Sequence, residues 1–193
     1  MMHLPTSFFL DTNVFILLSG LGSNDLSILS RAMVENKIKL CVSHVQIDEQ
    51  RNQESTDYQH KIKETFENLS EKGINIIVEP TNEVILDVSR FDYARFGSEK
   101  LGEIDKALRH EIEKCMGEKR KSDSNIARDA LIALSSLNHD YFITADRCLF
   151  NSWKIIIESN EKNKEALEKE YRVPEIIQRR KPKGVFQAIT SGK

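Results

Sequence analysis

The sequence lacks the features that mark membrane, secreted and disordered proteins. No apolar run approaches the roughly 18 residues that a membrane-spanning helix needs. The first residues show no basic segment followed by an apolar stretch and a small-residue cleavage site, so we expect no secretory signal and no membrane partner. With 8 Gly and 4 Pro among 193 residues, and with 39% apolar and 30% charged residues, the composition indicates a globular chain.

Cysteine is scarce, and no excess of charge stands out. Cys41, Cys115 and Cys148 are odd in number and widely spaced, with no CxxC pair. This pattern argues against a disulfide framework or a zinc cage and agrees with a reducing, cytoplasmic location. The formal net charge of −2 gives no general reason to expect a polyanionic partner, so any such partner must be recognised by local charge.

What the sequence does contain is an alternation of strand and helix patterns. Helical spacing of apolar residues is found between short apolar runs, which predicts a parallel sheet covered on both faces, that is, a three-layer α/β/α sandwich with a mostly parallel sheet. One run, at 37–43, alternates apolar and other residues as a half-exposed strand does. The expected strands are the apolar start of "FFLDTNVFIL" and residues 37–43, 73–80, 140–146 and 153–157.

Changes in charge divide the chain. Residues 1–157 hold the alternating pattern and are expected to form one domain, with a charged helical segment inserted at about 98–121. Residues 158–193 are expected to form a charged helical and basic C-terminal extension. Four of its basic side chains are candidates for contacts with nucleic-acid phosphates: Arg179, Arg180, Lys181 and Lys183.

Four acidic residues are expected at one edge of the sheet. Asp11 ends the first strand, and Asp146 ends the fourth. Glu49 lies in a helix beyond the second strand, and Asp129 lies near the start of the Ala-rich helix at 126–137. Ligands of open parallel sheets bind beyond the carboxyl ends of the strands, and a helix that precedes a parallel strand starts at that edge. Four converging carboxylates repel one another unless cations neutralise them, which predicts bound Mg²⁺ or Mn²⁺.

Each acid also has a purely structural interpretation. Asp11 before Thr and Asn is suited to an Asx-turn or a helix N-cap, and Asp146 to the start of a turn. Glu49 alone would be one of many acids on exposed helix faces. Asp123, in "KSDSNIA", is a strong N-cap candidate and competes with Asp129 for the third metal position. Only the joint placement of the acids at one edge favours chemistry over structure.

The ordered motifs "FLDTN", "VSHVQIDE", "DALIA" and "FITAD" resemble those of the PIN-domain nucleases, and among them the VapC-like toxins of toxin–antitoxin systems. The resemblance covers about residues 7–157. It implies a metal-dependent endoribonuclease whose catalytic and metal-binding residues are the four acids, with Asp123 as an auxiliary candidate. Side chains that orient the carboxylates or contact the phosphate would be Asn13, Ser43 and Thr144. Implied partners are an RNA substrate, an antitoxin protein and a second copy of the chain.

Two other functions remain open at this stage. A PIN-like module could bind RNA or a protein without cutting, although all four acids are present. A phosphatase with an Asp nucleophile on its first strand is disfavoured, because that chemistry normally needs a second Asp at position 13, where this chain has Asn. Metal uptake separates the first alternative from a nuclease, and activity on a small phosphomonoester would reveal the second.

Overall fold

The computed structural model describes residues 5–47, 56–81, 98–117 and 122–191. A five-stranded sheet in the order β3-β2-β1-β4-β5 forms its centre, and every strand pair is parallel. The α/β fold with a parallel sheet is therefore as predicted, and the sheet has no antiparallel strand among the described residues. The strands are β1 (Ser7–Leu10), β2 (Lys39–Ser43), β3 (Ile76–Glu79), β4 (Tyr141–Thr144) and β5 (Glu175–Gln178).

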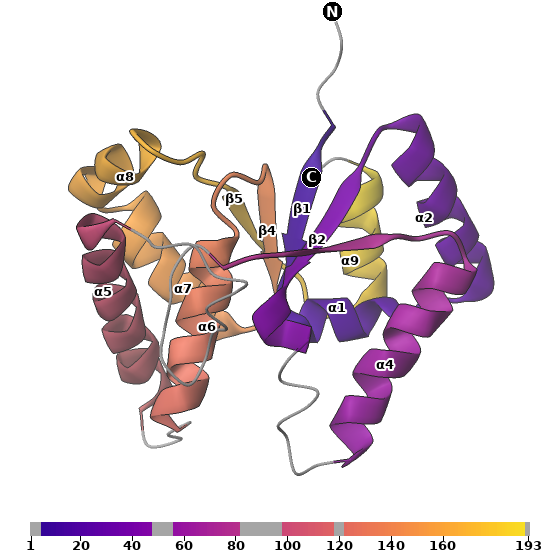
Figure 1. Ribbon diagram of the computed structural model, residues 1–193, viewed down its shortest axis with the longest axis horizontal. Helices are drawn as coiled ribbons and strands as arrows, with labels where there is room; N and C mark the ends of the chain where they lie inside the picture. The colour runs from indigo at the N-terminus through magenta and orange to yellow at the C-terminus, as the bar shows by residue number, and fades with distance from the viewer. Residues whose placement is uncertain (1–4, 48–55, 82–97, 118–121, 192–193) are drawn as a thin grey trace, which may run out of the picture.

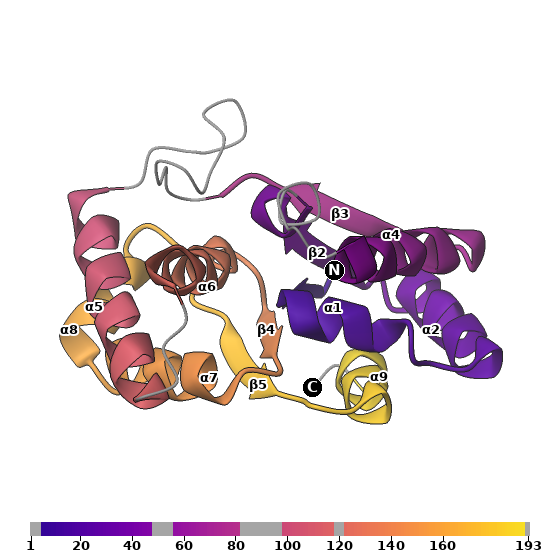
Figure 2. The same cartoon turned by 90° about the horizontal axis from the view of Figure 1, so that it is seen from below.

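Helices cover both faces of the sheet, and each face has its own hydrophobic core. Figures 1 and 2 show two groups of helices with the sheet between them. Phe9, Cys41 and Phe142 point into the first core, whereas Phe8 and Leu40 point into the second. The first group is α5 (Glu99–Met116), α6 (Asp123–Ser135), α7 (Arg147–Trp153) and α8 (Glu161–Glu168); the second is α1 (Thr12–Leu18), α2 (Ser23–Glu35), α4 (Thr56–Glu71) and α9 (Pro182–Thr190).

Strand β2 is buried more completely than its sequence pattern predicts. Residues 40–43 are all buried, including Cys41, which the alternation placed on an exposed face. The reason is that β2 lies between β1 and β3, and that the first group of helices covers one of its faces while the second group covers the other. The prediction of a half-exposed strand at 37–43 is therefore wrong, while the strand itself is confirmed.

The segment predicted as a fifth strand at 153–157 is helical. It is the end of α7 followed by a π-helix, η1 (Lys154–Glu158), with a hydrogen bond from Ser159 N to Lys154 O. Trp153 and Ile157, four residues apart, are both fully buried, while Ile155 between them is 52% exposed. Five apolar residues are too few to distinguish a helical from a strand period, and the burial pattern follows the helix.

The true fifth strand comes from the part of the chain expected to be an extension. β5 pairs with β4 in register from Tyr141↔Glu175 to Thr144↔Gln178, and α9 packs against α1 and α2. Residues after 157 therefore complete the sheet and one hydrophobic core. The helix α5 of the expected insertion likewise packs against α6 and α7 as part of the first group.

Two cysteines form a disulfide bond, contrary to the expectation from their spacing. Cys115 near the end of α5 is bonded to Cys148 in the first turn of α7, with the two Cα atoms 5.5 Å apart. Their sequence separation of 33 matches no short motif, so only the packing of α5 against α7 brings them together. Cys41 is the remaining free cysteine. In the described parts of the chain, no helix has the length and apolar character to cross a membrane.

Candidate active site

Asp11 directly follows β1 and is almost fully buried, at 3% exposure. It occupies the N-cap position of α1, but its side chain makes no capping hydrogen bond. Instead, its Oδ2 accepts a hydrogen bond from the Thr144 hydroxyl at 2.9 Å. The carboxylate of Asp11 interacts with the backbone of Thr12 at the start of α1, but it makes no conventional capping bond and faces the end of the neighbouring strand β4.

Thr144 connects Asp11 to the acid that follows β4. The Thr144 Oγ1 accepts a hydrogen bond from the backbone N–H of Asp146 at 3.0 Å while donating to Asp11. Asp146 Oδ1 accepts from the backbone N–H groups of Cys148 and Leu149, at 2.7 and 3.0 Å, and so caps α7. The cap involves one oxygen of this half-buried carboxylate, and it holds the side chain in a fixed position beside Thr144.

A third acid, Asp129, acts electrostatically on Asp11. Burial first, and then the negative charges of Asp129 and Asp146, raise the pKa of Asp11 from 3.8 to about 7, against the lowering effect of the hydrogen bond from Thr144. The structure thus brings three of the four predicted acids, Asp11, Asp129 and Asp146, into one electrostatic group. Negative charge that is this concentrated and this poorly solvated favours either a proton or a cation.

Asp129 and Asp123 have different surroundings although both lie on α6. Asp129 is half-buried and interacts with Asp11, whereas Asp123 is exposed and lines a pocket with Lys106, Arg109 and His110. The N-cap of α6 is Ser122, whose side chain accepts from the N–H of Asn125, so the prediction of Asp123 as the cap is wrong. Of the two acids, Asp129 is the one whose charge acts on Asp11, and its preference over Asp123 as the third metal ligand stays a prediction.

The fourth acid, Glu49, lies outside the described residues. The helical residues 44–47 are described, and one of them, Gln46, connects two strands of the sheet. Gln46 Oε1 accepts from the Ser43 N–H at 2.7 Å, and Gln46 Nε2 donates to Leu10 O at 2.8 Å. Ser43 thus contacts Gln46 rather than a described carboxylate, and Gln46 ties the end of β2 to the end of β1, next to Asp11.

Sequence reasoning missed Gln46, although a local signal was present. Ser43 and Gln46 have the S-x-x-Q spacing of a capping box, in which the fourth side chain reaches back to the N–H of the first residue. That is the contact observed. Asn13, the remaining predicted polar contact, is exposed in the first turn of α1, and no contact within the described parts of the chain brings it to a carboxylate.

The basic segment 179–183 begins at the same edge of the sheet as the acids. β5 ends at Gln178, level with Thr144, and the N–H of Arg179 donates to Thr144 O at 2.9 Å. Arg179 is half-buried, with its guanidinium bonded to Gln178 O, whereas Arg180, Lys181 and Lys183 are exposed. Cationic side chains therefore lie at the edge where the carboxylates converge.

The donors at this edge suit a hard divalent cation. They are carboxylate oxygens, one of which belongs to a residue whose pKa is raised by burial and like charge. A divalent cation held by Asp11, Asp129 and Asp146 would relieve that repulsion. Among the described residues, the side chains whose potential ligand atoms already lie within 4.8 Å of one another are a different set, Cys41, Glu79 and His139.

Comparisons with models of known protein families, with curated proteins and with solved structures give no significant match for this chain.

Proposed function

We propose that the protein is a metal-dependent nuclease of the PIN-domain kind, acting on RNA. The observation that carries the proposal is the convergence of Asp11, Asp129 and Asp146 at the carboxyl edge of the sheet, where burial and mutual repulsion raise the pKa of Asp11 to about 7. The motifs quoted above support the family, and the basic segment beside the acids supports a polyanionic substrate. We propose Glu49, outside the described residues, as the fourth carboxylate.

In this mechanism the three described acids would hold Mg²⁺ or Mn²⁺, which when bound prepares a water for attack on a phosphodiester and stabilises the leaving oxygen. Thr144 positions Asp11 by donating to it and holds the backbone of Asp146 by accepting from it. Gln46 keeps the end of β2 against Leu10, so that the site is attached to three adjacent strands. The exposed Arg180, Lys181 and Lys183 would neutralise substrate phosphates.

The test is an RNA cleavage assay in Mn²⁺, Mg²⁺ or excess chelator, comparing the parent chain with Asp129→Asn. Asn keeps the size of the side chain and removes its charge, so we expect cleavage to fall by at least about 100-fold, as for loss of a group that stabilises transition-state charge. Asp123→Asn is the matched control, because it makes the same change on the same helix at an exposed position.

Cleavage that persists in chelator, or in Asp129→Asn, would overturn the mechanism. Loss of cleavage in Asp123→Asn alone would move the third ligand to that position. If calorimetric titration shows no uptake of Mn²⁺ and no RNA is cut, the alternative of a non-cleaving RNA- or protein-binding module replaces the nuclease. The same protein should be assayed on DNA, since the carboxylates themselves do not distinguish the two polymers.

A further inference from the structure

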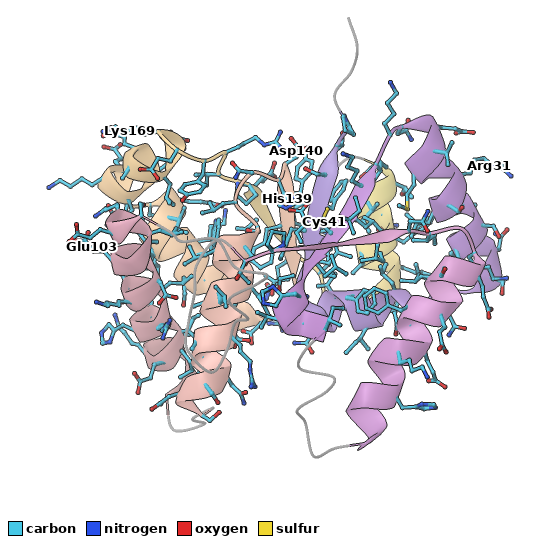
Figure 3. All side chains as sticks on the ribbon, in the orientation of Figure 1. Arg31, Cys41, Glu103, His139, Asp140 and Lys169 are labelled. Carbon is cyan, nitrogen blue, oxygen red and sulfur yellow. A yellow bond between two sulfur atoms is a disulfide. The ribbon has the colours of Figure 1, made fainter. Side chains whose placement is uncertain are left out.

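A second group of chemically reactive side chains lies on the face of the sheet covered by α5, α6 and α7. It consists of Cys41, Glu79 and His139, and one ligand atom from each, a sulfur, a carboxylate oxygen and an imidazole nitrogen, lies within 4.8 Å of the others. Figure 3 labels Cys41 and His139 close together near the centre of the molecule. Cys41 is 1% exposed, His139 is 4% exposed, and the Glu79 side chain is 35% exposed.

Three different elements place these side chains together. Cys41 lies in β2 opposite Ile77 of β3, and Glu79 comes two residues after Ile77, so Cys41 and Glu79 point to the same face. His139 lies in the turn between α6 and β4, with its ring against Phe9 at a centroid distance of 5.1 Å.

That turn is itself fixed. Asn138 has a positive φ of 78°, its N–H donates to Arg172 O, and its Oδ1 accepts from the Arg172 N–H. The imidazole of the next residue, His139, is therefore held in place by the backbone as well as by packing. A donor held in this way loses little conformational freedom when it binds a ligand.

Glu79 lies close to both of the other side chains in the group. Its Oε2 lies 3.3 Å from His139 Nε2, and its carboxylate also interacts with the nearby Cys41 thiol. Burial, followed by the charge of Glu79, raises the pKa of Cys41 to about 12. A buried thiol with a pKa raised in this way is a poor nucleophile, so catalysis by Cys41 is not favoured. As a metal ligand it would release its proton to the solvent when the ion binds. The other ring nitrogen of His139, Nδ1, is buried and has no hydrogen-bond partner among the described residues.

We propose that Cys41, Glu79 and His139 form a zinc site that shares no residue with the group of Asp11, Asp129 and Asp146. Sulfur and imidazole nitrogen are the donors that Zn²⁺ prefers, while Mg²⁺ and Mn²⁺ prefer oxygen alone. Ligand atoms around a tetrahedral zinc ion lie about 3.5 Å apart, given bond lengths of about 2.0 to 2.3 Å, so small side-chain adjustments close the site. The exposed side of Glu79 leaves room for a water as the fourth ligand.

The ion would fasten the edge of the sheet. β3 is an edge strand, and its Ile77 and Val78 are 39% and 43% exposed, so it buries less of its side-chain surface than β1 and β2 do. Zinc held by Glu79 of β3, Cys41 of β2 and His139 beside β4 would join this strand to two others. Because the three side chains come together only in the folded chain, an ion that binds them stabilises the folded state. None of its residues belongs to the proposed nuclease site, so either proposal can fail without the other.

The test uses Co²⁺ as a spectroscopic substitute for Zn²⁺ in the full-length, metal-stripped protein. A thiolate bound to Co²⁺ gives a charge-transfer band in the near ultraviolet, and tetrahedral Co²⁺ gives visible bands. We expect both to saturate at one equivalent, to disappear on adding Zn²⁺, and to be absent in Cys41→Ser. The double variant Cys115→Ser/Cys148→Ser, which removes the other two sulfurs, and Asp146→Asn should keep them.

A parent protein without the charge-transfer band, or a Cys41→Ser variant that keeps it, would overturn the zinc site. Should Cys41→Ser fail to fold, Glu79→Gln tests the same site at its more exposed ligand. This variant should bind Co²⁺ at least tenfold more weakly with an unchanged circular dichroism spectrum, and equal affinity would refute the proposal. Zinc should also raise the melting temperature of the parent chain, and of the double cysteine variant, by more than that of Cys41→Ser.

Discussion

Asp11 shows how a single carboxylate can be costly to the fold and useful to the site. It is 3% exposed and has two like charges nearby, and the hydrogen bond from Thr144 offsets only part of that cost. Strain of this kind at one residue is typical of functional sites, where surrounding packing maintains an arrangement that local energetics disfavour. The buried residues of β1 and α1 on either side provide that packing.

The raised pKa of Asp11 makes a prediction about stability. Since the folded-state pKa of about 7 lies above the unfolded value near 3.8, the folded chain binds the proton more tightly. Stability is then full below about pH 4 and falls as the pH rises towards 7. Because a pKa difference of one corresponds to about 1.4 kcal/mol, the cost at pH 8 is on the order of 4 kcal/mol. In chelator, Asp11→Asn should therefore be more stable than the parent at pH 8 and nearly equal to it near pH 4.

Urea unfolding of both proteins across this pH range measures the difference. Asp123→Asn, at an exposed position, should follow the parent chain throughout. Added Mn²⁺ should stabilise the parent at pH 8 and leave Asp11→Asn unchanged, because only the parent has the full set of charges. A difference between Asp11→Asn and the parent that does not depend on pH would show that Asp11 is not destabilised as its surroundings indicate.

Among the secondary-structure elements, features that depend on neighbouring residues could be predicted from the sequence, whereas features that depend on packing between distant elements could not. Asp11 and Asp146 could be predicted to lie at one edge of the sheet because each comes within two residues of the end of a short apolar strand, and strand ends of a parallel sheet meet at one edge. The segment 153–157 was misjudged because a short apolar run carries no clear period. Its place in the sheet is taken by β5, whose two buried Ile residues are flanked by Glu and Gln.

Contacts between distant positions had no local signal at all. Cys41, Glu79 and His139 come from separate elements, and nothing in the neighbourhood of any one of them indicates the other two. The same holds for Cys115 and Cys148, since the odd number and wide spacing of the cysteines argued against a disulfide framework. Such pairs follow from the packing of α5 on α7 and of β2 on β3, which depends on the whole core.

The disulfide between α5 and α7 predicts a redox-dependent stability. It closes a loop with a sequence separation of 33, for which the chain-entropy model gives about 3 to 4 kcal/mol of stabilisation. Urea unfolding of the parent with and without reductant should show a loss of this order. Cys148→Ala should show the same loss without reductant and no further loss with it, whereas Cys41→Ser should keep its response to reductant. An unchanged midpoint on reduction of the parent would contradict this role.

The Cys148 backbone also belongs to the carboxylate site, which links this element to the whole molecule. Its N–H donates to Asp146 Oδ1, so the residue that carries the disulfide sulfur also positions an acid. The acids, the disulfide and the basic segment after β5 all lie around the carboxyl ends of β1, β4 and β5. Helix α8, by contrast, precedes β5 and lies towards the opposite end of the sheet (Figure 1).

Because the acids and the basic segment lie at the same end of the sheet, we predict that RNA binds at that end. The variant Arg180→Ala/Lys181→Ala/Lys183→Ala removes three exposed charges beside the acids, and the control Lys162→Ala/Lys164→Ala/Lys169→Ala removes three from or next to α8, where Lys169 is labelled in Figure 3. Both triple variants change the net charge equally. If all three basic side chains after β5 contact phosphates, the first variant should reduce the slope of log K against log salt by about 2 for single-stranded RNA, and the control should leave it unchanged.

The measurement is binding of a labelled single-stranded RNA at a series of salt concentrations, made in an Asp129→Asn background so that the RNA is not cut. Equal weakening by the two triple variants would show that only overall charge matters and that residues 180–183 are an ordinary solvated surface. A selective loss with the first variant would place the polyanion along the carboxyl edge, where its phosphates would lie next to Asp11 and Asp146. The two triple variants differ only in where the charges are removed. The comparison therefore tests where the RNA binds, independently of the chemistry that cuts it.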